Sequence, residues 1–142
     1  MFLALWSLFL AAIGTLPLEN FVGHSHWDYI VWIPSTDLLR SRRFWFDVVA
    51  NVGVFMPFGY LLARSFPRTS LPKVLGTAAL LGGLFSLGIE FYQVYCHNRH
   101  PSPMDLASNL LGSVAGAVLA SAWGGHKPDG LTRVGYSHPT GS

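Results

Sequence analysis

Four apolar stretches of nearly membrane-spanning length constrain the fold of this chain more than any other feature of its sequence. They cover residues 2–18, 48–63, 74–94 and 106–123. A helix needs about 20 apolar residues, and at least about 17, to cross a hydrocarbon core about 30 Å thick. Charged residues make up only 11% of the chain, whereas soluble domains carry about 25%. We therefore predict an all-α integral membrane protein with about four transmembrane helices.

The two ends of the chain are predicted to differ. Residues 2–18 could be mistaken for a signal peptide, but they lack a basic first region and a small-residue cleavage site, so we expect a retained helix. From Gly124 onward, Gly, Pro, Ser and Thr dominate without an apolar period, which is typical of disorder. We predict a single transmembrane domain over residues 1–123 and a disordered cytoplasmic tail over residues 124–142.

Basic residues decide the expected orientation. With four spans, the loop of residues 64–73 and the tail lie on the same side of the membrane, and this side carries Arg64, Arg68, Lys73, Lys127 and Arg133. The opposite side carries Arg40, Arg42, Arg43 and Arg99. Cytoplasmic loops carry the excess of Lys and Arg. We expect a multi-pass protein of the bacterial inner membrane with both termini in the cytoplasm.

The segment between the first two apolar stretches is long and rich in aromatic residues. Its rings belong to Phe21, Trp27, Tyr29, Trp32, Phe44, Trp45 and Phe46. Indole and phenol rings favour the headgroup level of a bilayer. Ser35 or Thr36 is placed to cap a short surface helix through residues 37–39. We predict an interfacial segment that anchors the protein, in preference to a catalytic loop.

Small residues and one proline indicate how the helices pack. Pro57 and Gly59 lie in the second stretch, where Pro57 predicts a bend near Gly53. Gly112 and Gly116 stand four residues apart in the fourth stretch. Small residues at this spacing let helix backbones approach closely in a membrane. We predict that these glycines lie in helix–helix contacts.

Polar residues recur at matched positions within the apolar stretches. "FDVVAN" at residues 46–51 and "MDLASN" at residues 104–109 each place an Asn four residues after an Asp, on one helix face. The third stretch adds Ser86, Glu90 and Gln93 on one face, and Arg99 follows in the loop. Because neighbouring spans run in opposite directions, we expect these side chains near one membrane surface. The predicted cluster is Asp47, Asn51, Glu90, Gln93, Arg99, Asp105 and Asn109.

Two interpretations of this cluster stay open. A carboxylate inside a membrane helix costs about 2.5–3.5 kcal/mol on insertion scales, so it normally faces a partner or a wet cavity. In the first interpretation, the Glu90 carboxyl is protonated or paired with Arg99 and is hydrogen-bonded to Asn51 or Asn109, and the cluster holds helices together. In the second, the cluster lines a pocket that binds a headgroup or a sugar-bearing ligand. The first has slightly more weight, since polar pairs in membranes usually join helices.

The ordered set of motifs resembles the VanZ-like family of small bacterial membrane proteins. The resemblance lies in "DVVANVGVFMPFGYLL" from Asp47 and in "SLGIEFYQVYCHNRHPSPMDLASNLLGSVAG" from Ser86. The positions that match the family pattern are Asn51, Pro57, Gly59, Glu90, Gln93, Arg99, Asp105, Asn109 and Gly112. The resemblance implies a multi-span helical protein of the bacterial cell envelope, and it implies no established reaction.

We expect a non-enzymatic membrane protein whose polar pocket engages an envelope lipid or glycopeptide. The alternative is an accessory or structural subunit packed against a larger membrane protein complex. Membrane lipids are expected partners. Nucleic acid is not, because the net charge is only +2 and no basic run occurs. No phosphate-binding loop or nucleophile elbow is present, although paired carboxylates leave acid–base chemistry open. No cofactor is expected.

Histidines are the remaining candidates for chemistry. His24, His26, Cys96, His97 and His100 fall on one side of the predicted membrane topology. His and Cys are good zinc or copper ligands, but these spacings match no familiar metal-binding motif, and loop histidines are usually solvated. We therefore predict no metal site, and metal analysis of the purified protein tests that prediction.

Overall fold

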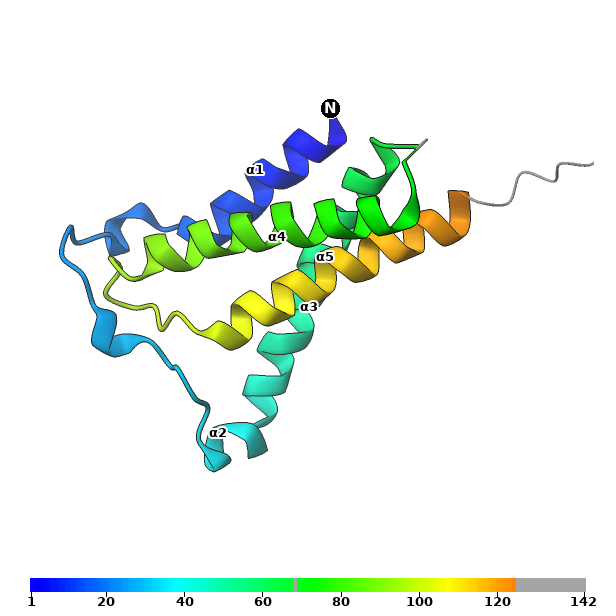
Figure 1. The fold of residues 1–142 in the computed structure, drawn as a ribbon. Coiled ribbons are helices and arrows are strands. Elements are labelled where there is room, and N and C mark those ends of the chain that lie inside the picture. The colour runs from blue at the N-terminus through cyan, green and yellow to red at the C-terminus, as the bar shows by residue number, and fades with distance from the viewer. Residues whose placement is uncertain (68, 125–142) are drawn as a thin grey trace, which may run out of the picture.

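The computed structural model describes residues 1–67 and 69–124, and helices account for most of them (Figure 1). The helices are α1 (Phe2–Thr15), α2 (Thr36–Arg40), α3 (Arg42–Arg64), α4 (Leu71–Gln93) and α5 (Pro103–Gly124), with single 3-10 turns at Leu18–Asn20 and Trp27–Tyr29. The described residues contain no β-strand, so the predicted all-α fold is confirmed. Of the predicted tail, Gly124 ends α5, and residues 125–142 lie outside the described residues.

Three of the four predicted apolar helices are long enough to cross a membrane by length and composition: α3, α4 and α5. The fourth, α1, has 14 residues and is about 21 Å long, which is shorter than a hydrocarbon core. It ends before Pro17, because Leu16 takes an extended conformation with ψ of 150° and a residue before proline disfavours the helical region. The four apolar helices and the membrane class agree with the prediction.

The helix starts differ from the predicted boundaries. The apolar stretches begin at residues 48 and 106, but α3 begins at Arg42 and α5 at Pro103. Backbone hydrogen bonding continues a helix into polar sequence, so a span and its helix need not begin at the same residue. α3 is also continuous through Pro57, although the proline ring nitrogen cannot donate to the preceding turn. The predicted bend near Gly53 stays a prediction.

Glycines bring α3 and α5 into direct backbone contact. A Cβ atom added at Gly116 would lie 1.9 Å from the carbonyl oxygen of Met56, and one at Gly112 would lie 2.4 Å from that of Val52. On the opposite helix, Gly59 faces the backbone of Ser113, with only 1.8 Å available for a Cβ. The predicted packing glycines therefore lie where α3 and α5 approach each other closely.

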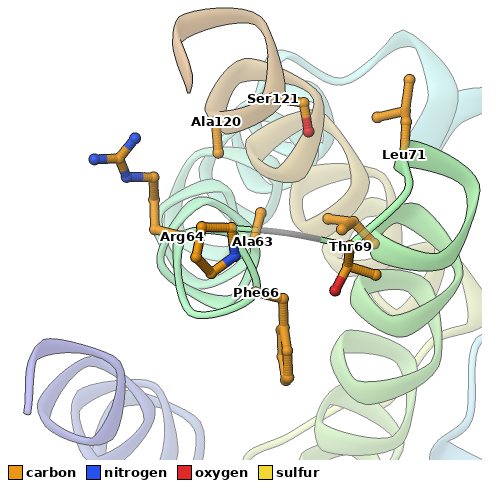
Figure 2. Close-up of a pocket in the computed structure, with 9 residues that line it drawn as sticks. Ala63, Arg64, Phe66, Thr69, Leu71, Ala120 and Ser121 are labelled. Carbon is orange, nitrogen blue, oxygen red and sulfur yellow. The ribbon is translucent and has the colours of Figure 1, made fainter. Parts of the chain in front are cut away.

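The turn between α3 and α4 marks the end of the bundle opposite the long loops. A cavity of about 500 Å³ lies there, lined from the end of α3, the turn, the start of α4 and the end of α5. Figure 2 shows Ala63, Phe66, Leu71 and Ser121 around it. None of the seven predicted cluster residues lines this cavity.

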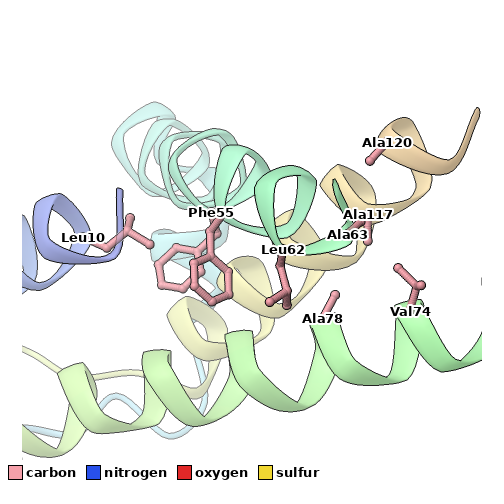
Figure 3. Close-up of a cluster of buried hydrophobic side chains, with 9 residues drawn as sticks. Leu10, Phe55, Leu62, Ala63, Val74, Ala78, Ala117 and Ala120 are labelled. Atoms are coloured by element: carbon pink, nitrogen blue, oxygen red, sulfur yellow. The ribbon is translucent and has the colours of Figure 1, made fainter. Parts of the chain in front are cut away.

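An apolar core joins all four of the longer helices. Leu10 of α1 is fully buried and belongs to the same cluster as Phe55 and Leu62 of α3 and Ala78 of α4 (Figure 3). Ala117 of α5 is also fully buried in it. Although α1 is short, it is therefore an integral part of the bundle.

The long first loop folds over the end of the bundle where α4 finishes and α5 begins (Figure 1). Backbone N–H groups of Val22 and His26 donate to the carbonyls of Tyr95 and Val94, at 3.0 and 2.8 Å. Farther along, the N–H of Val31 donates to the carbonyl of Pro101. The short helix predicted after this loop is present as α2, and Ser35 caps it by accepting from the N–H of Leu38.

Candidate functional site

One cavity at the loop end of the bundle is lined by all seven residues of the predicted polar cluster. Its volume is about 500 Å³, and apolar side chains of α1, α3 and α4 complete its wall. The cluster residues in the wall are Asp47, Asn51, Glu90, Gln93, Arg99, Asp105 and Asn109. The structure thus brings together side chains that lie up to 62 residues apart in the sequence.

Helix direction explains this convergence. α3 and α5 both begin at the end of the bundle where α4 ends, so the first turns of two helices meet the last turn of a third. Asp47 and Asn51 are four residues apart on one face of α3, and Asp105 and Asn109 occupy the same relation on α5. Since both faces turn toward α4, the repeated pattern places one amide and one carboxylate from each helix at the cavity.

A continuous hydrogen-bond chain crosses the cavity wall. The Asn51 amide Nδ2 donates to Asp105 Oδ1 at 2.7 Å, and the Ser102 hydroxyl donates to Asp105 Oδ2 at 2.8 Å. The backbone N–H of Ser102 donates to Glu90 Oε2 at 3.0 Å. This chain links α3, α5, the preceding loop and α4. It provides hydrogen-bond donors to both carboxyl groups.

Ser102 is the one member of this hydrogen-bond chain that was not among the predicted site residues. It precedes α5, and its hydroxyl also accepts a hydrogen bond from the N–H of Asp105 at 3.1 Å. The sequence carried a signal for this role, because Ser102 is followed by Pro103 and, three residues on, by Asp105. Serine before a proline at the first helical position, with an acidic residue three positions later, is typical of a helix N-terminus.

The partners predicted for Glu90 were wrong in detail. We expected Arg99, Asn51 or Asn109, but the partner of the Glu90 carboxylate is the Ser102 backbone. Arg99 instead donates to the carbonyl of Leu16 at 2.9 Å. The physical reason is that the loop after α4 folds back and places a free backbone N–H over the carboxylate, while the Arg99 side chain extends toward the end of α1.

Asn109 forms the deepest polar contact of the site. Its side chain is only 4% exposed, and its Nδ2 donates to the hydroxyl of Ser86, which is fully buried, at 2.8 Å. Its Oδ1 is buried and has no hydrogen-bond partner among the described residues. An unpaired buried acceptor costs about 1–3 kcal/mol. Asn109 therefore holds an acceptor with unused capacity in the wall of the cavity.

Polar contacts also attach α1 to the site. Gln93 Nε2 donates to the carbonyl of Gly14 at 3.0 Å, and the indole of Trp6 donates to the carbonyl of Val54 at 3.0 Å. A Cβ atom at Gly14 would lie 2.7 Å from the Ile89 side chain, so α1 approaches α4 closely. α1 thereby closes one side of the cavity.

The charges around the cavity are of both signs. Three carboxylates, those of Asp47, Glu90 and Asp105, share the wall with the guanidinium groups of Arg43 and Arg99. Arg43 and Asp47 are exposed, so the cavity can be reached from outside the protein. Carboxylates and amide oxygens accept hydrogen bonds from hydroxyl groups, whereas arginines bind phosphate or carboxylate.

A second cavity of about 500 Å³ adjoins the polar one. Arg43, Asp47, His100 and Asp105 line both. The remaining wall of the second cavity is largely apolar and comes from α2, α3, the start of α5 and the two loops, with Val31, Pro34, Leu38, Phe44, Val48 and Met104. A polar cavity and a largely apolar one thus lie side by side at this end of the protein and share four wall residues.

Comparison with known proteins identifies one family. The family model described as VanZ/LLP1 matches residues 2–124 of the chain. Neither the curated proteins nor the solved structures include a match.

Proposed function

The chain belongs to the VanZ/LLP1 family, and we propose that it is a non-enzymatic membrane protein whose polar cavity binds the headgroup of an envelope lipid. The observation that carries this proposal is the gathering of seven polar side chains from α3, α4, α5 and the α4–α5 loop in the wall of one cavity. One of these residues, Asn109, has a buried Oδ1 with no hydrogen-bond partner among the described residues, and a small side-chain movement would let this oxygen accept from a hydroxyl or amide of a ligand.

The chemistry of the wall favours a sugar-phosphate headgroup. Sugar hydroxyls can donate to the three carboxylates and to Asn109. The phosphate of the same headgroup can pair with Arg43 or Arg99, whose guanidinium groups offer bidentate hydrogen bonds. A simple cation would not use the arginines, and a simple anion would be repelled by the carboxylates.

The adjoining cavity favours a lipid over a soluble glycopeptide. An amphiphile could place its headgroup among the polar side chains and the first part of its chain against Leu38, Phe44 and Val48. Sites for small ligands are mostly apolar, with a few polar groups that set orientation. The two spaces together offer this combination.

Replacement of Glu90 by glutamine tests the proposal. The chain is purified in mild detergent, and co-purifying lipids and proteins are identified by mass spectrometry. Glu90→Gln removes the charge but keeps an oxygen that can accept from the Ser102 N–H, so the fold should persist. We expect the wild type to retain one class of sugar-phosphate lipid, and we expect Glu90→Gln to retain at least about tenfold less, since a charge-assisted hydrogen bond contributes about 1.5–3 kcal/mol.

Glu19→Gln provides the matched control, because Glu19 is exposed and lies outside the cavity wall. It should leave lipid retention unchanged. Equal retention by wild type and Glu90→Gln would contradict the proposal. Failure of Glu90→Gln to accumulate in the membrane would show instead that the cluster mainly joins helices.

The same experiment addresses the alternative, an accessory subunit of a larger membrane complex. Stoichiometric co-purification of other membrane proteins, without a retained lipid, would favour that role. The buried hydrogen bonds of the cluster would then serve only to hold α3, α4 and α5 together.

A further inference from the structure

Three histidines from two distant loops lie together outside the helical bundle. His24 and His26 belong to the loop between α1 and α2, and His97 belongs to the loop between α4 and α5. One ligand nitrogen from each lies within 4.8 Å of the other two. The ring centroids are 4.7 Å apart for His24 and His26, 4.9 Å for His26 and His97, and 5.4 Å for His24 and His97.

The backbone fixes this arrangement. The His26 N–H donates to the carbonyl of Val94 at 2.8 Å, and the His97 N–H donates to the carbonyl of Asn20 at 3.0 Å. Between Asn20 and His26 in the sequence, Gly23 has a φ of +77°. Such a conformation is accessible to glycine at no steric cost, and it turns the chain so that His24 and His26 both reach His97. The cluster therefore does not depend on chance contacts of mobile side chains.

His26 is the buried member of the cluster, and one of its ring nitrogens has no hydrogen-bond partner among the described residues. Its side chain is only 9% exposed, and its Nε2 is buried without a hydrogen-bond partner among the described residues. Tyr29 stacks on the ring at 4.7 Å, with an interplanar angle of 14°, and so restricts its rotation. A buried imidazole nitrogen with no donor or acceptor nearby is costly, and a metal ion would supply the partner it lacks.

We propose that His24, His26 and His97 form a site for a divalent transition-metal ion, with Zn²⁺ as the best match. Zinc binds imidazole nitrogen at about 2.0–2.1 Å, which requires the nitrogens of a tetrahedral site to lie about 3.4 Å apart. The cluster reaches that spacing by small side-chain rotations of His24 and His97, both of which are exposed. Three protein ligands leave the fourth position open for water or another ligand.

The site is separate from the proposed headgroup cavity. None of its three histidines lines that cavity. Its ligands come from both loops, so a bound ion would join the α1–α2 connection to the α4–α5 loop in addition to the backbone hydrogen bonds already present. Imidazole ligands suit Zn²⁺, Cu²⁺ and Ni²⁺, whereas Ca²⁺ and Mg²⁺ prefer oxygen.

Zinc binding to the purified full chain tests the proposal. Equilibrium dialysis against ZnCl₂ in mild detergent, with metal analysis of the protein, should give one bound zinc per chain. The variants His24→Ala and His97→Ala alter exposed side chains and should each weaken binding at least about tenfold. Competing Mg²⁺ should not displace the zinc.

Asp28→Asn is the matched control, because Asp28 is an exposed potential metal ligand in the same loop as His24 and His26 but outside the cluster. It should bind zinc as the wild type does, and circular dichroism should show equal helix content in all four proteins. Absence of zinc binding by the wild type would overturn the proposal. Retained binding in the double variant His24→Ala/His97→Ala, or an equal loss in Asp28→Asn, would overturn it as well.

Discussion

At the scale of single residues, the contact between Asn51 and Asp105 is the shortest side-chain link between the two helices that carry the repeated pattern. The Asn51 amide donates to the Asp105 carboxylate at 2.7 Å across α3 and α5. Side-chain hydrogen bonds between membrane helices average about 0.6 kcal/mol and reach about 1.7 kcal/mol. A charged acceptor should place this one in the upper part of that range.

A double-mutant cycle with Asn51→Ala and Asp105→Ala measures this contact. We expect each single variant to lower the free energy of unfolding in detergent, and we expect the double variant to lose less than the sum. The predicted coupling energy is about 1–1.7 kcal/mol. Additive losses would show that the two residues act independently.

Residue types and spacing were sufficient to find the seven residues of the cavity wall, because positions on a helix face follow directly from sequence separation. The partner of each residue could not be found in the same way. Glu90 accepts a hydrogen bond from the backbone N–H of Ser102 because the loop of residues 94–102 folds back over α4. The types and spacing of side chains do not indicate which backbone N–H groups of a loop will be available as donors.

At the scale of helices, the contact of α3 with α5 depends on the absence of side chains. Gly116→Ala would place a methyl group 1.9 Å from the Met56 carbonyl, and overpacking of this kind costs about 1–3 kcal/mol. We expect the free energy of unfolding to fall by that amount, as measured by reversible denaturation in mixed detergent micelles.

Gly88→Ala is the control for that prediction. Gly88 lies in α4, and an added Cβ would meet no atom within 4 Å. Alanine is the better helix former by about 1 kcal/mol, so this variant should be as stable as the wild type or more stable. Equal destabilisation by both substitutions would show that the α3–α5 contact is not the cause.

Helix types were predictable and helix ends were not. The apolar stretches fixed which segments would be helical, and Pro17 explains the early end of α1. The polar first turns of α3 and α5, at residues 42–47 and 103–105, lie outside the predicted apolar stretches, because composition alone separates apolar from polar sequence. Cavity walls in membrane proteins are built from such polar helix ends.

At the scale of the whole molecule, the expected orientation places the long loops outside the cytoplasm. The chain contains one cysteine, Cys96, which is 2% exposed, so new cysteines can be labelled selectively. With the membrane intact, Ser25→Cys should react with a membrane-impermeant maleimide, and Ser70→Cys should react only after permeabilisation. Both serines are exposed in the structure, so neither depends on unfolding to react.

The reverse labelling pattern would contradict the predicted orientation, and equal labelling of both cysteines would contradict their placement on opposite sides. The reverse pattern would also place the cavity and the histidine cluster together on the cytoplasmic side, because both lie at the loop end of the bundle.

The tertiary arrangement of the loops was the least predictable part of the molecule. Aromatic composition predicted an interfacial segment between the first two helices, but it contained no information on pairing with residues 94–101. From the sequence alone, the histidines are therefore separate loop residues whose spacing matches no familiar metal-binding motif. Their proximity depends on backbone hydrogen bonds between segments that are more than 65 residues apart.

The docking of the first loop onto the last one also sets an order of events during synthesis. Val22 and His26 leave the ribosome roughly 70 residues before their carbonyl partners at Tyr95 and Val94, which at about 5–20 residues per second is a wait of roughly 4–14 s. Over that interval the first loop lacks the partners that hold it in place. The histidine cluster can therefore form only after His97 has been made, and the closed cavity only after Asn109 of α5 has been made.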